Sequence, residues 1–249
     1  MRMVLTALLA GCFFIARAEN LEGVTFASIP TKVFVPLREI SPLLGWEIEW
    51  VEEGGKIILA GKELDKKHIK LLFDGTKCLD LAACRERGAE IEISEGGDTF
   101  TVVSGEKSVT IYIPEHETEV STKYQELRGW QGNRLVMRTH ISTGRGGATP
   151  HGSFSAGPKI RHKTSRKYNN APMPWAVQVY GDIFIHGSSS VPNYPASHGC
   201  VRMPYTGKNA ARYFFEWVNS GSSVKIVREW SEDAARFNEK KDADDGTKS

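Results

Sequence analysis

The sequence of 249 residues has few of the side chains that bind metals or form disulfides, with four cysteines and seven histidines. None of them forms the closely spaced Cys and His pairs that are typical of structural zinc sites. Of the potential ligands His151, His186, His198 and Cys200, only the last two are close in sequence. A zinc site built from these four residues is an alternative that depends on the fold bringing them together.

The sequence also lacks an apolar run of the ~20 residues that a helix needs to span a bilayer. The run at residues 4–15 is shorter, follows Arg2 and precedes Ala-Arg-Ala at 16–18, as in a secretory signal peptide. We expect residues 1–18 to be a signal peptide, and the protein to be exported to the periplasm or cell envelope. The alternative is a lipoprotein, because Leu-Ala-Gly-Cys at 9–12 resembles a lipobox whose Cys12 would anchor the protein to the membrane.

No single charge dominates the chain, whose formal net charge is +2 at pH 7. Residues 19–114 carry 11 basic and 17 acidic side chains, whereas residues 115–230 carry 15 and 7. A basic half attracts carboxylate-bearing partners by long-range steering. Nucleic acid is not expected as a partner, because no nucleic-acid-binding motif is found in this exported chain. The charged tail at 231–249 is expected to be solvated and flexible.

The first half contains an internal repeat. Residues 32–59 match residues 76–102 at an offset of 43. Gly45 aligns with Gly88, and the first unit contains a Glu-Gly-Gly turn. Each unit predicts a short helix, a glycine stop and a hairpin. The first helix is expected from about Pro36 to Leu44. Residues 19–105 are therefore predicted to form a small α+β domain built from two repeats.

Two cysteines lie in the second repeat unit. Cys78 aligns with Val35 and Cys84 with Ser41, so Cys78 is interpreted as a small core residue. A disulfide between Cys78 and Cys84 stays open, because export permits one and the spacing does not exclude the required Cα distance. The stretch VPLREISPLLGWEIEW (35–50) resembles the small domain at the N-terminus of copper amine oxidases. The resemblance implies a fold and no copper chemistry.

Residues 106–230 are predicted to be mainly β. Alternating or apolar runs occur at 108–114, 134–143, 176–187 and 222–229, each bounded by turn residues. One helix is expected from Asn209 to Asn219, because Tyr213, Phe214 and Trp217 follow at helical spacing. These aromatic side chains are interpreted as the core contact between that helix and a sheet.

The strongest functional signal is IFIHGSSSVPNYPASHGCVRMP (183–204). It combines an apolar strand ending in His186-Gly187 with a Ser-His-Gly-Cys turn that carries Cys200. A loop rich in Ser, Pro and Asn joins them and can fold back, so that the imidazole meets the thiol. A cysteine nucleophile needs such a base, because the thiolate is its reactive form.

The HG and SHGC elements resemble the L,D-transpeptidase catalytic domain, which remodels bacterial peptidoglycan. HISTGRGGATPHGSF (140–154) and APMPW (171–175) resemble further segments of that family, and the resemblance spans about 108–227. It implies a β-sandwich with a packed helix for residues 106–230. The chain departs from many members in having Arg202 where they have Asn.

The resemblance implies a set of roles for individual residues. Cys200 is the nucleophile and His186 its base, while the amides of Gly199 and Cys200 stabilise the oxyanion. Ser188 or its backbone orients His186, and His198 shapes the turn. The expected substrate-binding residues are Arg202, Trp175, Tyr194 and Ser197.

The implied activity is a cysteine-dependent acyl transfer between peptidoglycan stem peptides, or onto a wall-attached protein, without metal or organic cofactor. Two alternatives stay open. Water could resolve the same thioester, which would make the protein an L,D-carboxypeptidase or a cross-link hydrolase. The protein could also be a non-catalytic wall-binding protein. A fragment that begins near Ser104 is expected to fold alone.

Overall fold

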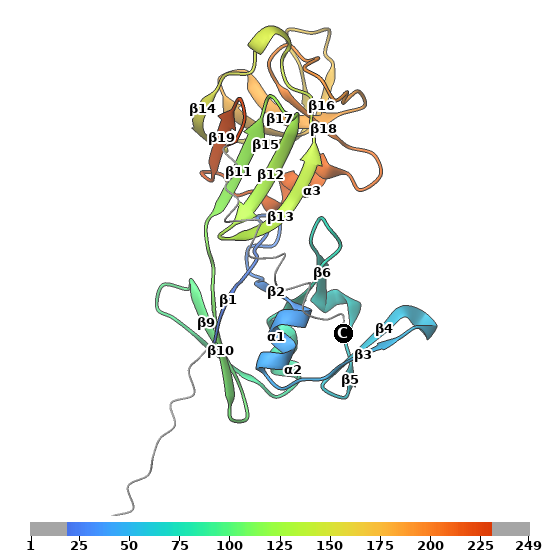
Figure 1. Ribbon diagram of the computed structural model, residues 1–249, viewed down its shortest axis with the longest axis vertical. Coiled ribbons are helices and arrows are strands. Elements are labelled where there is room, and N and C mark those ends of the chain that lie inside the picture. Colours follow the sequence, from blue (N-terminus) through green and yellow to red (C-terminus); the bar gives the residue numbers. More distant parts are fainter. Residues whose placement is uncertain (1–18, 231–249) are drawn as a thin grey trace, which may run out of the picture.

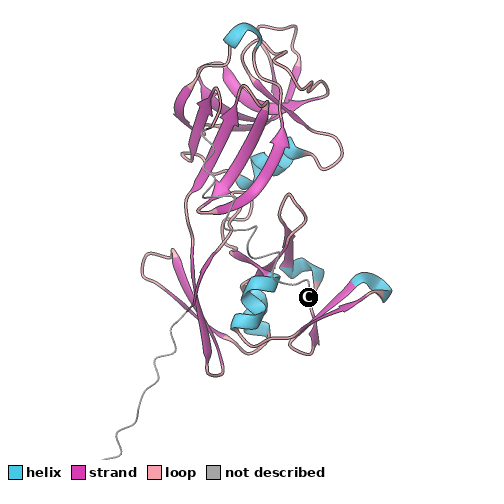
Figure 2. Ribbon diagram, in the orientation of Figure 1, coloured by secondary structure: helices cyan, strands magenta, loops and turns pink. Residues whose placement is uncertain are grey.

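The computed structural model describes residues 19–230 as an elongated molecule with two mainly β halves, one above the other (Figure 1). The predicted signal peptide, Cys12 and the charged tail lie outside the described residues. Strands dominate both halves, as Figure 2 shows, and this confirms the mainly β prediction for residues 106–230. None of the helices within 19–230 has the length and apolar character needed to cross a membrane.

The N-terminal half contains three small sheets with strand orders β1-β10-β9-β8, β2-β7-β6 and β3-β4-β5. Its strands are β1 (Glu19–Glu22), β2 (Phe34–Pro36), β3 (Ile48–Val51), β4 (Lys56–Leu59), β5 (Lys62–Glu63), β6 (Ile69–Leu71), β7 (Lys77–Asp80), β8 (Glu90–Ile93), β9 (Thr99–Ser104) and β10 (Lys107–Tyr112). Its helices are α1 (Leu37–Leu43), α2 (Ala82–Glu86) and the 3₁₀ turns η1 (Glu53–Gly55) and η2 (Lys66–His68).

Local chemistry accounts for the elements of this half. The first helix is one residue shorter at each end than expected, with Pro36 as its N-cap and Leu44 as its C-cap. Gly45 follows with a positive φ of 71°, a conformation that ends a helix cheaply only at glycine. Cys78 and Cys84 are free, buried thiols that belong to different hydrophobic clusters. The disulfide that the sequence left open is therefore absent here.

The C-terminal half has two larger sheets, of order β13-β12-β11-β19-β14 and β15-β16-β17-β18. Its strands are β11 (His116–Ser121), β12 (Glu126–Gln131), β13 (Arg134–His140), β14 (Gly152–Ser155), β15 (Lys159–Thr164), β16 (Pro172–Tyr180), β17 (Ile183–Ser188), β18 (Val201–Pro204) and β19 (Ser223–Val227). The 3₁₀ turn η3 (Arg145–Gly147) and helix α3 (Ala210–Trp217) complete it. Both sheets and α3 contribute to one hydrophobic core.

Helix α3 confirms the helix expected near 209–219. It starts one residue later because Asn209 is the N-cap, with its side chain accepting a hydrogen bond from the Arg212 amide at 2.9 Å. Phe214 and Trp217 are fully buried. The helix thus packs on the sheet β15-β16-β17-β18 with the aromatic face that its spacing predicted.

Strand pairing moves the domain boundary. The sequence placed residues 107–112 in the second domain, but β10 pairs with β9 and with β1 in an N-terminal sheet. Because β10 is hydrogen-bonded to strands of the N-terminal half, we place the domain boundary between Tyr112 and His116. Backbone pairing across large sequence separations is not visible in a local pattern.

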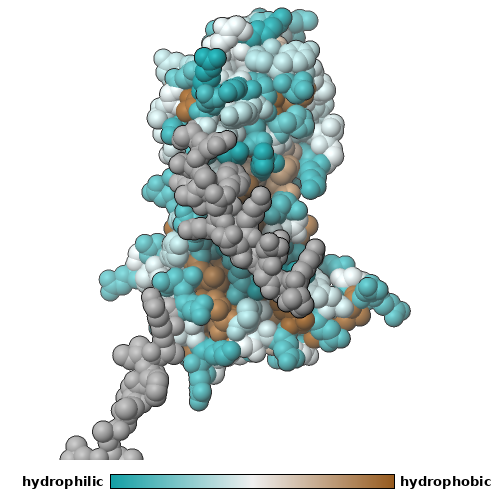
Figure 3. Space-filling view, in the orientation of Figure 1, coloured by the Kyte–Doolittle hydropathy of each residue, from teal (hydrophilic) through white to brown (hydrophobic). Residues whose placement is uncertain are grey.

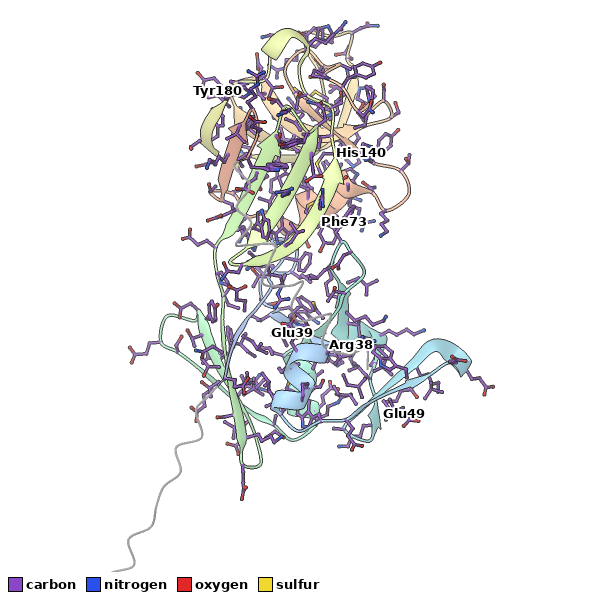
Figure 4. The ribbon with its side chains drawn as sticks, viewed as in Figure 1. Arg38, Glu39, Glu49, Phe73, His140 and Tyr180 are labelled. Atoms are coloured by element: carbon purple, nitrogen blue, oxygen red, sulfur yellow. The ribbon has the colours of Figure 1, made fainter. Side chains whose placement is uncertain are left out.

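The two halves share part of one core. Val24, Phe26, Phe34 and Leu72 belong to the same hydrophobic cluster as the residues of α3. The ring of Phe26 meets that of Tyr213 edge-on, with centroids 5.7 Å apart. Phe73, at the tip of the β6–β7 hairpin in Figure 4, also packs against Tyr213, with ring centroids 5.3 Å apart.

Polar contacts hold the same junction. The amides of Ala27 and Ser28 donate to the carbonyl oxygens of Trp217 and Glu216, so this segment caps the C-terminal end of α3. The Arg134 guanidinium binds the Glu39 carboxylate at 3.0 and 2.6 Å. A fragment that begins near Ser104 loses both sets of contacts, so the structure argues against its expected independent folding.

We predict that Phe26→Ala lowers the free energy of unfolding of the whole protein by about 3–5 kcal/mol, because the ring is 1% exposed at the junction. Thermal or urea unfolding would measure this. Tyr180→Ala is the control, since that ring is 61% exposed and its removal should change stability by less than about 0.5 kcal/mol. Equal stability of Phe26→Ala and the unchanged protein would contradict a shared core.

Candidate active site

The parallel pairing of β17 and β18 brings the two predicted catalytic residues together. Ile185 lies opposite Val201 and His186 opposite Arg202. Cys200 immediately precedes β18 and therefore lies beside Phe184. Since residues two apart in a strand share a face, His186, Phe184, Cys200 and Arg202 all lie on one face of the sheet. The opposite face carries Ile185 and Val201 into the core under α3.

Cys200 is a partly exposed thiol in an apolar bed. It packs against Met173, Ala176 and Phe184. Its Sγ lies 3.6 Å from the carbonyl oxygen of Asp182 and donates to it. Burial raises the pKa of this thiol above its ordinary value, although the Phe184 amide and the charges of Arg202 and Lys163 lower it in part.

His186 is buried and already oriented. Its Nδ1 lies 2.9 Å from the carbonyl oxygen of Gly187. Because a carbonyl can only accept, Nδ1 carries the proton and Nε2 is left with a lone pair. Burial lowers the pKa of His186 to about 4, and the charge of Arg202 lowers it further, against the effect of the Gly187 carbonyl.

The shifts of the two groups define the resting state of the pair. A raised thiol pKa and a lowered imidazole pKa both favour the uncharged forms at neutral pH. The thiol donates to Asp182, not to His186, in this state. The arrangement suits a general base that takes the thiol proton during attack, and not a preformed thiolate–imidazolium pair.

The Ser-His-Gly-Cys turn is fixed from inside. Ser197 Oγ donates to the Cys200 carbonyl at 2.6 Å and accepts from the Gly199 amide at 3.0 Å. Thr149 Oγ1 donates to the Gly199 carbonyl at 2.7 Å. Gly199 has φ of 141°, and a Cβ there would lie 2.8 Å from Ile183 Cδ1. The turn therefore requires glycine at this position.

These contacts correct two roles. The Gly199 amide is bonded to Ser197, so the expected pair of oxyanion donors reduces to the Cys200 amide. Ser197 is 3% exposed and holds the turn, which leaves no free face for the substrate contact expected of it. A buried hydroxyl group needs a hydrogen-bond partner, which is often a backbone group nearby, and the sequence does not show which backbone group that is.

Ser188 and His198 also differ from a simple catalytic role. Ser188 Oγ bonds the backbone of Ser190, and His186 is bonded to the Gly187 carbonyl and not to the Ser188 side chain. His198 is exposed and stacks on Tyr168 with ring centroids 4.1 Å apart. Arg145 Nη2 lies 3.4 Å from its Nε2. His198 thus supports the outside of the turn.

The expected substrate-binding residues separate. Arg202 lies on the face of Cys200, opposite His186. Tyr194 is 61% exposed to solvent. Its backbone carbonyl accepts a hydrogen bond from Ser142 Oγ at 2.7 Å. Trp175 packs on Phe215 of α3 and belongs to the cluster on the helix side. Its positive φ of 58° interrupts the regular alternation of side chains along β16.

Several supporting residues were not identified from sequence. Thr149 and Ser142 brace the turn and the loop before it, and Tyr168 and Lys167 come from the β15–β16 connection. Lys167 binds the carboxylate of Asp182 at 2.6 Å. Thr149 and Ser142 lie in the HISTGRGGATPHGSF stretch, which resembles a segment of the L,D-transpeptidase family. No local pattern indicated Tyr168 and Lys167, because they approach the site from another hairpin.

The zinc alternative does not fit this arrangement. His151 bonds Thr122 at 2.9 Å. Across residues 19–230, no three His, Cys, Asp or Glu side chains gather as metal ligands would.

Comparison with known proteins agrees with the site. Residues 115–226 match the family model YkuD, the L,D-transpeptidase catalytic domain. The C-terminal half therefore resembles an L,D-transpeptidase catalytic domain, and the matched residues make up less than half of the chain. No curated protein matches the sequence.

Solved structures give more distant likenesses. An L,D-transpeptidase from Xylanimonas cellulosilytica has 27% identity and a TM-score of 0.42, over 46% of this chain and 61% of that one. One from Stackebrandtia nassauensis has 20% identity and a TM-score of 0.41, over 45% and 55%. One from Mycobacterium smegmatis has 13% identity and a TM-score of 0.41, over 85% and 96%. The chain thus spans about three fifths or less of the first two proteins, and the assignment rests on the family model.

We predict that the rate of Cys200 alkylation by iodoacetamide keeps rising with pH beyond the ordinary thiol pKa of ~8.5. The rate should keep rising because the raised pKa leaves a smaller thiolate fraction at any given pH than an ordinary thiol would have. The rate would be followed by intact-mass spectrometry from pH 6 to 10. A plateau from pH 6 upward would instead indicate a preformed thiolate and would contradict the neutral pair.

We predict further that His186→Ala slows alkylation of Cys200 at pH 7 by about tenfold or more, because it removes the neutral base. His198→Ala is the matched control. That side chain stacks on Tyr168 at the outside of the turn and should have a much smaller effect. A larger loss in His198→Ala would reassign the base.

Proposed function

We propose that the protein is a peptidoglycan L,D-transpeptidase that acts through a thioester on Cys200. The observation that carries the proposal is that Cys200 and His186 lie on one face of the paired strands β17 and β18, within a segment that matches the YkuD family model. Partial exposure of the thiol supports it, since a substrate carbonyl has to reach Sγ.

The chemistry starts with the acyl donor. His186 Nε2 takes the thiol proton as Sγ attacks the carbonyl carbon between an L-centre and a D-centre of a stem peptide. The Cys200 amide stabilises the oxyanion. Collapse breaks the amide bond, and the departing amine of the D-residue takes the proton from His186. The products of this half-reaction are a thioester and a free D-residue.

The second half-reaction uses an amine acceptor, from another stem or from a wall-attached protein. Its nitrogen attacks the thioester, gives a proton to His186, and expels the thiolate, which is reprotonated. Water in place of the amine would make the enzyme a carboxypeptidase or a cross-link hydrolase.

The location and the first half of the chain belong to the same proposal. The predicted signal peptide would deliver the protein to the periplasm or cell envelope, and lipidation of Cys12 would hold it at the membrane. We propose that the N-terminal module, with its resemblance to the copper amine oxidase N-terminal domain, supports the catalytic domain through the Phe26 junction. In Figure 3 hydrophobic residues are visible on the surface of the N-terminal half, and exposed apolar surface of this kind suits contact with other molecules.

We predict that Cys200→Ser reduces acyl transfer by a factor on the order of 10³ or more while the thermal unfolding temperature stays close to that of the unchanged protein, because the swap is nearly isosteric. Purified protein, a stem tetrapeptide and an amine acceptor would be analysed by mass spectrometry.

The products of that assay separate the candidate activities. A cross-linked product and a mass increase on Cys200 support the transpeptidase. A shortened peptide alone indicates the hydrolytic activity. Absence of both, with normal binding to sacculi, would indicate a wall-binding protein.

A further inference from the structure

The peptide unit that joins Gly199 to Cys200 carries the amide assigned above to the oxyanion. This peptide bond is trans and planar, so its N–H and its C=O point in opposite directions. A group that fixes the direction of the Gly199 carbonyl therefore also fixes the direction of the Cys200 amide. Cys200 precedes β18, and within residues 19–230 its amide has no partner among the backbone hydrogen bonds of the loops and turns. The amide is thus available to a substrate oxygen.

Thr149 holds the other end of the same peptide unit. Its Oγ1 donates to the Gly199 carbonyl oxygen at 2.7 Å and accepts from the Gly144 amide at 2.7 Å. Because an N–H group can only donate, the single hydroxyl proton of Thr149 is committed to Gly199. The side chain is 2% exposed, and hydrogen bonds in such a low-dielectric site are strong. The hydroxyl therefore sets the plane of this peptide unit.

Close backbone packing brings Thr149 to this position. A Cβ at Gly144 would lie 2.8 Å from the Thr149 amide nitrogen and 2.9 Å from Gly199 Cα, so the three backbones are in direct contact. The Arg145 amide also donates to the Ser197 carbonyl at 3.0 Å, which fastens the same loop to the turn. The loop is thus attached to the turn without the Thr149 hydroxyl, whereas the direction of the Gly199 carbonyl depends on it.

We propose that Thr149 is a positioning residue for acyl transfer, whose hydroxyl aims the Cys200 amide at the oxyanion by holding the Gly199 carbonyl. The inference deepens the proposed function, on which it rests for the reaction at Cys200. An oxyanion donor is most effective when it already points to the place where the charge develops, because no reorganisation is then needed during the reaction. Thr149 is buried and its hydroxyl bonds two backbone groups, so it acts through the peptide unit.

The test compares two reactions of the Cys200 thiol. With p-nitrophenyl acetate, Sγ attacks the carbonyl carbon and an oxyanion forms. Its collapse breaks the ester C–O bond and gives an acetyl thioester and p-nitrophenolate, while the thiol proton passes to His186 and then to solvent. With iodoacetamide, Sγ displaces iodide from a saturated carbon, and no oxyanion forms. Absorbance of p-nitrophenolate and intact-mass spectrometry would follow the two rates at one pH, with Cys200→Ser as the background.

Three variants isolate the hydroxyl. Thr149→Val removes it and keeps a branched side chain, whereas Thr149→Ser keeps it. Thr143→Val is the matched control, because Thr143 is 1% exposed in the same loop and its Oγ1 accepts from Gln125 Nε2 at 2.7 Å. Thr149→Val leaves two buried backbone groups unpaired, so thermal unfolding would check that it folds. Thr149→Ala replaces it in the comparison with Thr149→Ser if it does not.

We expect Thr149→Val to slow acetylation of Cys200 about ten- to hundredfold, less than the loss of a whole oxyanion donor, and to leave alkylation almost unchanged. Thr149→Ser and Thr143→Val should keep both rates close to those of the unchanged protein. Equal losses in both reactions of Thr149→Val, or no loss in either, would overturn the proposal. So would a Thr149→Ser or Thr143→Val variant that acetylates as slowly as Thr149→Val.

The ester separates this inference from the proposed activity, because it tests the oxyanion site without a stem peptide. The expected pattern with the ester, together with no turnover of stem peptides, overturns the transpeptidase proposal alone. Turnover of stem peptides by Thr149→Val at the unchanged rate overturns the role of Thr149 alone. Absence of acetylation in the unchanged protein would overturn the oxyanion site on which Thr149 is proposed to act.

Discussion

The site depends on the parallel pairing of β17 with β18. That register places His186 opposite Arg202 and brings Cys200 beside Phe184, on one face of the sheet. A shift by one residue would turn Cys200 into the core beneath α3 and Ile185 out of it. The buried side chains of Ile185 and Val201 prevent the shift, because they anchor the other face of the same two strands.

Burial then decides the chemistry of the pair. Removing both groups from water disfavours their charged forms, so the thiol pKa rises and the imidazole pKa falls to about 4. The Gly187 carbonyl fixes the tautomer of His186, and the turn around Gly199 fixes the backbone next to Cys200. The charges of Arg202 and Lys163 partly offset the cost of forming a thiolate.

The N-terminal half takes part in this architecture through α3. Residues 24–28 place Phe26 against Tyr213 and cap the C-terminal carbonyls of the helix. Because α3 packs behind β16, β17 and β18, the segment supports the sheet that carries the site. The Glu39 and Arg134 pair adds a second, polar connection between the halves.

The sequence by itself determined the features that depend on local chemistry. Gly45 and Asn209 marked helix ends, and alternation marked the hairpin of β3 and β4. The HG and SHGC elements indicated the family model that residues 115–226 match, with His186 and Cys200 as the candidate catalytic residues. Such patterns span only a few residues, so they can be interpreted without knowing which strands pair.

The tertiary structure decided everything that depends on which distant groups meet. It assigned the Gly199 amide to Ser197, left Ser188 bound to its own loop, turned Trp175 toward α3 and moved β10 into the N-terminal sheet. It also brought Lys163 over Phe184 from another hairpin. Each of these outcomes is set by hydrogen-bond satisfaction or by strand register across long sequence separations, which residue type and spacing do not encode locally.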